Sequence, residues 1–234
     1  QADLFGTSVS VSRTTAIVGA SGDSDFEFNA GQIYVYDKIG STWTESAKLN
    51  AAEEEVDDRL GGSVSIYSSD DIDIIIGGAL GADDFGTQSG AAYIFERTTG
   101  GWSQAARLTA SDGAASDLFG EKVTVHGNVA VVGALLADAP GQNSGAAYVF
   151  ERQGNGTWIE TAKLTAPDGA PNDLFGASVA VWGSRILVGA WAHQGNTGAA
   201  YLFEDHGSGW EFTEKLQASD GANGDNFGHA LDIQ

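Results

Sequence analysis

The chain has 234 residues, of which 32 are Asp or Glu and 11 are Lys or Arg, so its formal net charge is −21. A charge of this sign repels nucleic acid and anionic membrane surfaces, which excludes both as partners. No apolar run approaches the roughly 20 residues that a membrane-spanning helix needs, so we expect no membrane insertion. The chain contains no Cys and no Met, which excludes disulfides, cysteine-ligated metals and a thiol nucleophile. Because Gln1 is not an initiator residue, we expect a processed or excised piece.

An internal repeat is the strongest signal in the sequence. Its marks keep one order: a segment ending in Phe-Gly or Leu-Gly, a Gly-Ala pair, two aromatic residues, one Trp, and a basic residue followed by Leu. The glycine of the first mark recurs at Gly6, Gly61, Gly120, Gly176 and Gly228. These marks divide the chain into repeats of about 3–57, 58–116, 117–172 and 173–224, with a partial repeat at 225–234.

Taken in chain order, each repeat predicts four short strands, A to D. In the third repeat these strands are expected at 122–125, 129–132, 146–150 and 158–164, with Gly/Asn hairpin signals between A and B and between C and D. Strand B is apolar on both faces, which predicts that it is covered on both sides. Four-stranded antiparallel sheets stacked in series are typical of propeller blades. We therefore predict an all-β fold, a β-propeller of four full repeats plus the first strand of a fifth at 226–233.

Four repeats and one further strand do not describe a self-contained four-bladed ring. We expect either a segment of a longer propeller or a chain that self-associates with another copy to complete the ring. A closed four-bladed ring, in which the last strand replaces or covers another, is the alternative. An open end would expose strand edges and blade faces, which folded proteins avoid.

The Phe-Gly before strand A and the Gly-Ala after strand B resemble the FG-GAP repeats of integrin α-subunit propellers and of many bacterial surface proteins. The resemblance covers essentially the whole chain and implies an extracellular or cell-surface location. In that family calcium lies in the A–B loop on an Asp-x-Asp-x-Asp-Gly run. The A–B loops here lack that pattern, and only Asp70, Asp71 and Asp73 are dense enough to consider. The resemblance therefore does not carry its calcium site to these loops.

Acidic residues gather in the other set of loops. Antiparallel strand order places the B–C and D–A connections on one rim, opposite the A–B and C–D hairpins. In the first B–C loop, oxygen-bearing side chains stand at every second position, as Asp23, Asp25, Glu27 and Asn29. Such alternation can cage Ca²⁺, so these four residues are the predicted metal ligands and Ca²⁺ the predicted cofactor. The competing interpretation is that acids in these loops, including the repeated Asp-Gly turns, only bond backbone N–H groups.

Two tryptophans break the repeat and are candidates for ligand contact. Trp43, Trp102, Trp158 and Trp210 recur once per repeat, so we expect them to pack. Trp182 lies in an A–B hairpin and Trp191 begins a B–C loop. Loop aromatics of this kind contact sugar rings or protein partners. With His193 they form the predicted ligand-binding set.

The sequence does not favour catalysis. Its four histidines occupy unrelated repeat positions, and it contains no Gly-x-Ser-x-Gly motif. We predict a non-enzymatic, secreted recognition or adhesion module that binds a glycan or a protein through the rim of B–C and D–A loops. Two alternatives stay open: an accessory or scaffold domain of a polysaccharide-processing enzyme, and a structural surface or filament subunit.

Overall fold

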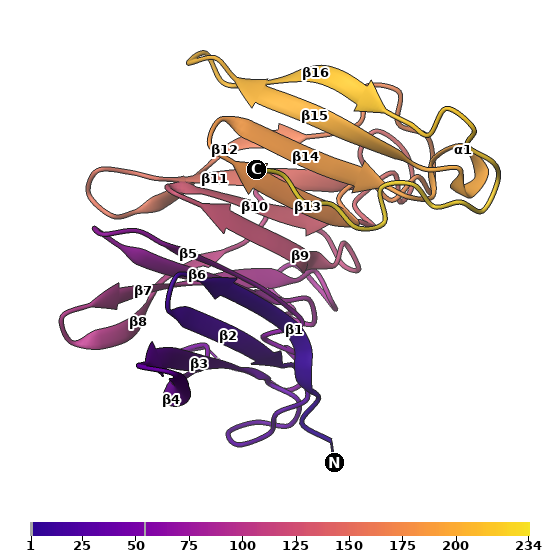
Figure 1. Cartoon of the computed structure of the whole chain (residues 1–234). Helices are drawn as coiled ribbons and strands as arrows, with labels where there is room; N and C mark the ends of the chain where they lie inside the picture. Colours follow the sequence, from indigo (N-terminus) through magenta and orange to yellow (C-terminus); the bar gives the residue numbers. More distant parts are fainter. Residues whose placement is uncertain (1, 54) are drawn as a thin grey trace.

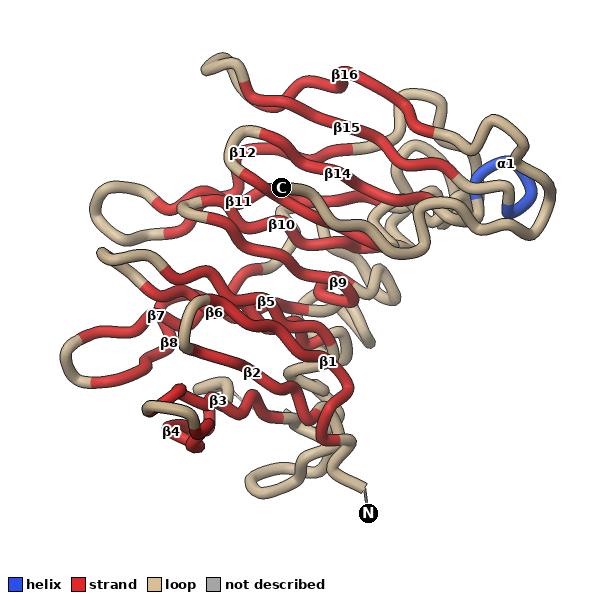
Figure 2. Tube along the Cα trace, in the orientation of Figure 1, coloured by secondary structure: helices blue, strands red, loops and turns tan. Residues whose placement is uncertain are grey.

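The structure is a computed structural model that describes residues 2–53 and 55–234, and its regular secondary structure over these residues is almost entirely β-strand. Four antiparallel four-stranded sheets follow one another, each with its strands paired in chain order (Figure 1). We call these sheets blades 1 to 4, and the strands of each blade A to D. The tube view shows the blades stacked in series, with long loops at both ends of the strands (Figure 2).

The strands have the following bounds. Blade 1 contains β1 (Phe5–Ser12), β2 (Thr15–Ala20), β3 (Gln32–Ile39) and β4 (Thr42–Leu49). Blade 2 contains β5 (Ser63–Ser68), β6 (Asp73–Ala79), β7 (Ala91–Thr98) and β8 (Gly101–Leu108). Blade 3 contains β9 (Phe119–His126), β10 (Val129–Ala134), β11 (Ala146–Arg152) and β12 (Trp158–Leu164). Blade 4 contains β13 (Ser178–Trp182), β14 (Arg185–Ala190), β15 (Ala199–Asp205) and β16 (Trp210–Leu216), with the short helix α1 (His193–Asn196) between β14 and β15.

The predicted all-β propeller architecture is confirmed, and the four strands of the third repeat lie where they were expected. The last of them, β12, has the predicted bounds, whereas β9 begins three residues earlier than predicted because the chain already pairs with β10 at Phe119. Strand β10 is buried on both faces, as its sequence indicated.

Each blade has two unlike faces, and the core lies between neighbouring blades. The face that looks back at the preceding blade carries the two aromatic residues of strand C, such as Tyr93 and Phe95 in blade 2. The face that looks forward carries small and aliphatic residues, such as Ile17, Ile33 and Val35 in blade 1, which pack against those rings. We call these the aromatic face and the aliphatic face. Two more clusters repeat this arrangement between blades 2 and 3 and between blades 3 and 4.

The glycines of the repeat are explained by close backbone approach. A Cβ atom on Gly78, from the Gly-Ala pair of blade 2, would lie 1.9 Å from the carbonyl oxygen of Gly120. A Cβ on Gly133 would lie 2.1 Å from the carbonyl oxygen of Gly176. Gly120 and Gly176 also have φ near +90°, which other residues rarely adopt. The two glycine marks of the repeat therefore face each other across each blade boundary.

The loops divide between two rims. The A–B and C–D hairpins lie at one end of the strands, here called the hairpin rim, and the B–C and D–A connections with α1 lie at the other, called the connection rim (Figure 1). This division agrees with the rims expected from strand order. No described helix has the length and apolarity needed to cross a membrane.

The stack does not close into a ring. The predicted fifth strand A at 226–233 is not a strand in the structure, although the segment lies over blade 4, where a further strand A would lie (Figure 1). A strand A bonds to strand B of its own repeat, and residues 225–234 have no such partner within the part of the chain that the structure describes.

Candidate functional site

The connection rim is held together by backbone hydrogen bonds between consecutive repeats. Asp57 N–H donates to the carbonyl of Phe28 at 2.8 Å, and Asn172 N–H donates to the carbonyl of Gln142 at 2.9 Å. Each bond links a B–C loop to the D–A connection that follows it. The acidic loops of this rim are therefore parts of an ordered framework.

The first two predicted metal ligands already have partners within the protein. Asp23 is buried, and its two carboxylate oxygens accept hydrogen bonds from the Tyr34 hydroxyl at 2.7 Å and from Asp25 N–H at 3.0 Å. The Asp25 carboxylate is exposed and forms an ion pair with Lys48 at 3.1 Å. Asp23 therefore acts as a turn and anchor residue, as the competing interpretation expected.

The other two predicted ligands have different surroundings. Glu27 is exposed, and Asn29 donates from its side-chain amide to the Asp57 carboxylate at 2.7 Å. Among the described residues, no three His, Cys, Asp or Glu side chains are arranged to hold a metal ion. The four residues are near in sequence, but their side chains do not converge in this structure. Calcium binding stays a prediction.

The Asp-Gly turns have a repeated structural role that the sequence did not reveal. In blade 3, the Tyr148 hydroxyl and the Lys163 ammonium donate to Asp112 at 2.8 and 2.6 Å, and the ammonium lies 5.3 Å from the tyrosine ring centroid. Burial tends to raise the pKa of the Asp112 carboxyl, but the hydrogen bonds from Lys163 and Tyr148 outweigh it and lower that pKa. These Asp residues thus anchor strands C and D to the preceding turn.

Blade 4 repeats this anchor with Tyr201, Lys215 and Asp168, and adds a histidine. His193 is 3% exposed, and its Nδ1 lies 2.7 Å from Oδ2 of Asp173. Its Nε2 lies 2.7 Å from the Lys215 ammonium. An ammonium group can only donate, so Nε2 accepts and Nδ1 carries the proton that it donates to Asp173. His193 is therefore a buried link between the turn that contains Asp173 and Lys215 of β16, and it has no free ring nitrogen for a ligand.

An open pocket of about 560 Å³ lies beside this link. Its lining includes Asp168, Pro171, His193 and residues 194–196 of α1. Gln194 and Asn196 have positive φ angles of 51° and 68°, which are unusual for residues other than glycine. The B–C loop of blade 4 thus takes a conformation unlike a regular helix, and it places His193 inward.

The three predicted ligand-binding residues are not brought together. His193 and Trp191 lie on the connection rim, where the Trp191 ring packs 5.9 Å from the His229 ring. Trp182 ends β13 on the opposite, hairpin rim and is 48% exposed. Trp182 alone of the three keeps a large accessible aromatic surface, so the binding rim expected from sequence is not the rim that carries this surface.

An aromatic row on the hairpin rim was missed at the sequence level. The Tyr67 ring lies 4.9 Å from the His126 ring, which lies 4.2 Å from the Trp182 ring, all measured between centroids. The three residues occupy one repeat position, seven residues after the Phe or Leu of the glycine mark, where blade 1 has Ser12. Aligning this position across the repeats would have revealed the row. We call Tyr67, His126 and Trp182 the rim aromatic row.

The rim aromatic row borders a hollow of about 320 Å³ between the A strands. Hydroxyl groups line it, from Ser12, Ser65, Ser68 and Thr124. Ser68 Oγ is buried and has no hydrogen-bond partner within the described part of the chain. Burial lowers the pKa of His126, and its Nδ1 lies 3.2 Å from the Gly183 N–H, which donates to it. The hollow therefore combines apolar ring surface with hydroxyl groups, and Asp232 also lines it.

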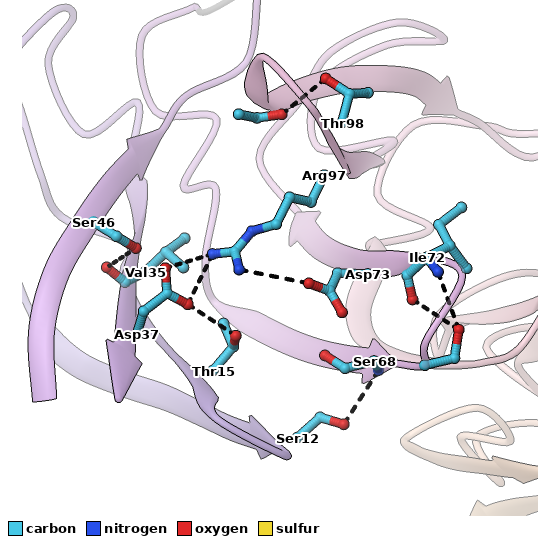
Figure 3. Close-up of polar contacts among 12 residues, drawn as sticks. Ser12, Thr15, Val35, Asp37, Ser46, Ser68, Ile72, Asp73, Arg97 and Thr98 are labelled. Carbon is cyan, nitrogen blue, oxygen red and sulfur yellow. Dashed lines mark hydrogen bonds and ion pairs between the residues drawn. The ribbon is translucent and has the colours of Figure 1, made fainter. Parts of the chain in front are cut away.

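Ion pairs join neighbouring blades beyond the hollow. Arg97 of blade 2 donates two hydrogen bonds to Asp37 of blade 1 at 2.8 and 2.6 Å, and it lies 3.6 Å from Asp73 of its own blade (Figure 3). Thr15 donates to the same Asp37 carboxylate at 2.9 Å. Burial favours the protonated form of Asp37, but the bonds from Arg97 and other donors prevail and lower the pKa of that carboxyl. This side of the blade boundary is fixed by charge as well as by packing.

Comparison with known sequences supports the repeat assignment. The sequence model of the FG-GAP repeat matches residues 1–36, 43–95, 102–150 and 158–203, which is most of the chain. A search of curated proteins found no match. Each matched segment ends at the second aromatic residue of a strand C, and the last three begin at the repeated Trp of the preceding strand D. The chain belongs to the FG-GAP repeat family, as a β-propeller module of the integrin-like kind.

Proposed function

We propose that the protein is a non-enzymatic, extracellular recognition module that binds a neutral glycan on its hairpin rim. FG-GAP repeats are typical of extracellular proteins. The observation that carries the proposal is the rim aromatic row beside a hydroxyl-lined hollow. A sugar ring stacks its apolar face on an aromatic side chain, and its hydroxyls need nearby hydrogen-bonding groups.

Charge favours a neutral ligand over an acidic one. The residues that line the hollow include Asp232 but no Lys or Arg. The chain as a whole carries a net charge of −21, which repels acidic polysaccharides. The Ser68 hydroxyl beside the hollow has no hydrogen-bond partner in the described part of the chain, and a buried hydroxyl without a partner costs free energy.

The experiment is a glycan array followed by titration calorimetry on the best ligand, with one variant on each rim. We expect Trp182→Ala to weaken binding at least about tenfold, which corresponds to about 1.4 kcal/mol. Trp191→Ala is the matched control and should bind like the unmodified protein. Ser68→Ala should weaken binding less than Trp182→Ala.

Two results would contradict the proposal. One is an array on which no neutral glycan binds. The other is binding that Trp191→Ala abolishes and Trp182→Ala leaves unchanged, which would return the ligand to the connection rim. Circular dichroism of each variant shows that a loss of binding is not a loss of fold.

A further inference from the structure

A second hollow lies on the hairpin rim, next to the one between the A strands. It has a volume of about 420 Å³, and its lining includes Ile72 of the β5–β6 hairpin, Asn128 of the β9–β10 hairpin and Arg152 at the end of β11. All of its lining residues belong to blades 2 and 3, so it lies at an internal blade boundary. We call it the hairpin hollow, and the hollow between the A strands the strand hollow. Both volumes are in the range of sites for small ligands.

Tyr67 joins the two hollows. Among the described residues it alone lines both of them. Its ring lies 4.9 Å from the His126 ring, and the rim aromatic row continues from there to Trp182 in the strand hollow. A ligand that stacks along the row therefore reaches the hairpin hollow at Tyr67.

The hairpin hollow contains hydrogen-bonding groups that the protein itself does not use. Asn128 is exposed, and its side-chain amide has no partner among the described residues. Asp71 is exposed as well, and its backbone N–H donates to Ser69 Oγ while its carboxylate has no partner in the described part of the chain. An amide both donates and accepts, and a carboxylate accepts. Sugar hydroxyls also donate and accept, so they match both groups.

Arg152 adds a donor that is fixed in position. Its Nε and Nη2 donate to the Glu96 carboxylate at 2.7 and 2.9 Å. A bidentate pair of this kind fixes the plane of the guanidinium. The guanidinium carries further N–H donors on Nη1, which makes no hydrogen bond within the described residues. Arg152 can therefore bind a ligand oxygen without giving up its ion pair.

The charges around the hairpin hollow fit a neutral ligand. Glu96 already balances the charge of Arg152, and Asp71 adds an acid without a partner among the described residues. An anionic ligand would thus meet a balanced cation and an unbalanced carboxylate, in a chain whose net charge is −21. The half-buried Ile72 and the Tyr67 ring supply apolar surface. The hairpin hollow and the strand hollow therefore offer similar chemistry on either side of Tyr67.

From this arrangement we infer that the hairpin hollow is a second sugar subsite, and that the hairpin rim binds a neutral oligosaccharide whose chain crosses Tyr67. One part of the chain packs on Trp182 in the strand hollow. The next part bonds to Asn128, Asp71 and Arg152 in the hairpin hollow. The inference rests on the proposed function, because it extends the same glycan site, and it adds a requirement for chain length.

The test is titration calorimetry of the full chain with neutral saccharides of one to six units, built from glucose, mannose, galactose or N-acetylglucosamine. In the series that binds, we expect the affinity to rise at least about tenfold from the single sugar to the hexasaccharide. The reason is that only the longer chain makes the added contacts in the hairpin hollow.

A pair of matched variants identifies the hollow that causes this rise. Asn128→Ala should weaken binding of the hexasaccharide about three- to tenfold, as expected for one hydrogen bond, and leave binding of the single sugar unchanged. Ser184→Ala is the control, because Ser184 has the same place in the β13–β14 hairpin, is exposed and lines neither hollow. It should bind the hexasaccharide like the unmodified protein. Trp182→Ala should weaken single sugar and hexasaccharide by the same factor.

The outcomes separate this inference from the proposed function. If no neutral saccharide binds at any length, both are wrong. If Trp182→Ala weakens binding but the affinity does not depend on length, only the second subsite is wrong. The same holds if Asn128→Ala and Ser184→Ala bind the hexasaccharide equally well. Oligosaccharides of galacturonic acid are the acidic probe, and tighter binding of these than of every neutral series would overturn the assignment of a neutral ligand.

Discussion

The turns that precede blades 2 and 4 contain the same residue in two different electrostatic settings. Asp58 and Asp173 stand two residues before the Leu or Phe of the glycine mark, both are 3% exposed, and each accepts a backbone N–H three residues earlier. Opposite Asp58 the B–C loop has Ala82, whereas opposite Asp173 it has His193. One side chain some twenty residues away therefore decides whether this buried carboxylate has a side-chain partner.

At Asp58, which has no such partner among the described residues, the pKa of the carboxyl group is raised. Burial, with the nearby carboxylates of Glu55 and Asp83, raises the pKa of Asp58 to about 6, and the bond from Glu55 N–H and the charge of Arg107 only partly oppose this. Burial also raises the pKa of Asp117, which faces Ala137 in the same way. A repeat motif thus specifies the turn but not the electrostatic surroundings of its acid.

The largest expected effect comes from removing the added histidine. His193→Ala gives blade 4 the residue that blades 2 and 3 already have, so the fold should survive. It removes the hydrogen bond to Asp173 and the contact with Lys215, and we expect a loss of about 2 kcal/mol in the free energy of unfolding. Urea denaturation of both proteins measures this loss of stability.

His206→Ala is the control for this change, because the His206 side chain is exposed. It should alter stability by less than about 0.5 kcal/mol. If His193→Ala and His206→Ala lower stability equally, the contacts of His193 with Asp173 and Lys215 do not stabilise the fold, and the contrast drawn between Asp58 and Asp173 is wrong.

Substitution of Asp58 is expected to change the free energy of unfolding by a smaller amount and in the opposite direction. Because its pKa is raised on folding, the folded state binds this proton more tightly than the unfolded chain. Protonated Asp58 therefore stabilises the folded state fully at pH below the ordinary pKa of an aspartate, and this stabilisation is lost as the pH rises through about 6. Asp58→Asn keeps an acceptor for Glu55 N–H without the charge, so it should gain on the order of 1 kcal/mol at pH 7.

Thermal denaturation from pH 4 to pH 8 measures this gain and its disappearance in acid. Asp173→Asn should behave in the opposite way and lose stability at pH 7, since the bond from His193 Nδ1 then meets a neutral group. Equal responses of the two variants would show that the residue opposite each Asp does not matter.

The smallest effect distinguishes the two anchors of strand D. Lys163→Gln and Lys215→Gln both remove an ion pair with an Asp and a contact with a tyrosine ring, but only Lys215 also contacts His193. We expect Lys215→Gln to cost roughly 0.5 kcal/mol more than Lys163→Gln. A double-mutant cycle of Lys215→Gln with His193→Ala should assign this difference to their contact.

Much of the fold could be predicted from the sequence because the repeated residues meet requirements of the backbone and of strand burial. Gly78 and Gly133 are needed where two backbones meet, and strand β10 is apolar throughout because both of its faces are covered. Such constraints act within one repeat and recur in each. The site could not be predicted in the same way, because the exposure of Trp182 and His193 depends on contacts with residues distant in the sequence, such as His126 and Asp173.

By itself the sequence determined the number of blades, their strand order and the two rims, since these follow from local periodicity, turn residues and antiparallel pairing. Only the tertiary structure decided which side chains meet: that Asp23 bonds Tyr34 while Asp25 pairs with Lys48, and that Trp182 packs against His126. These contacts join residues of different strands and blades, so they depend on how the sheets stack. The spacing of residues along the chain does not show how the sheets stack.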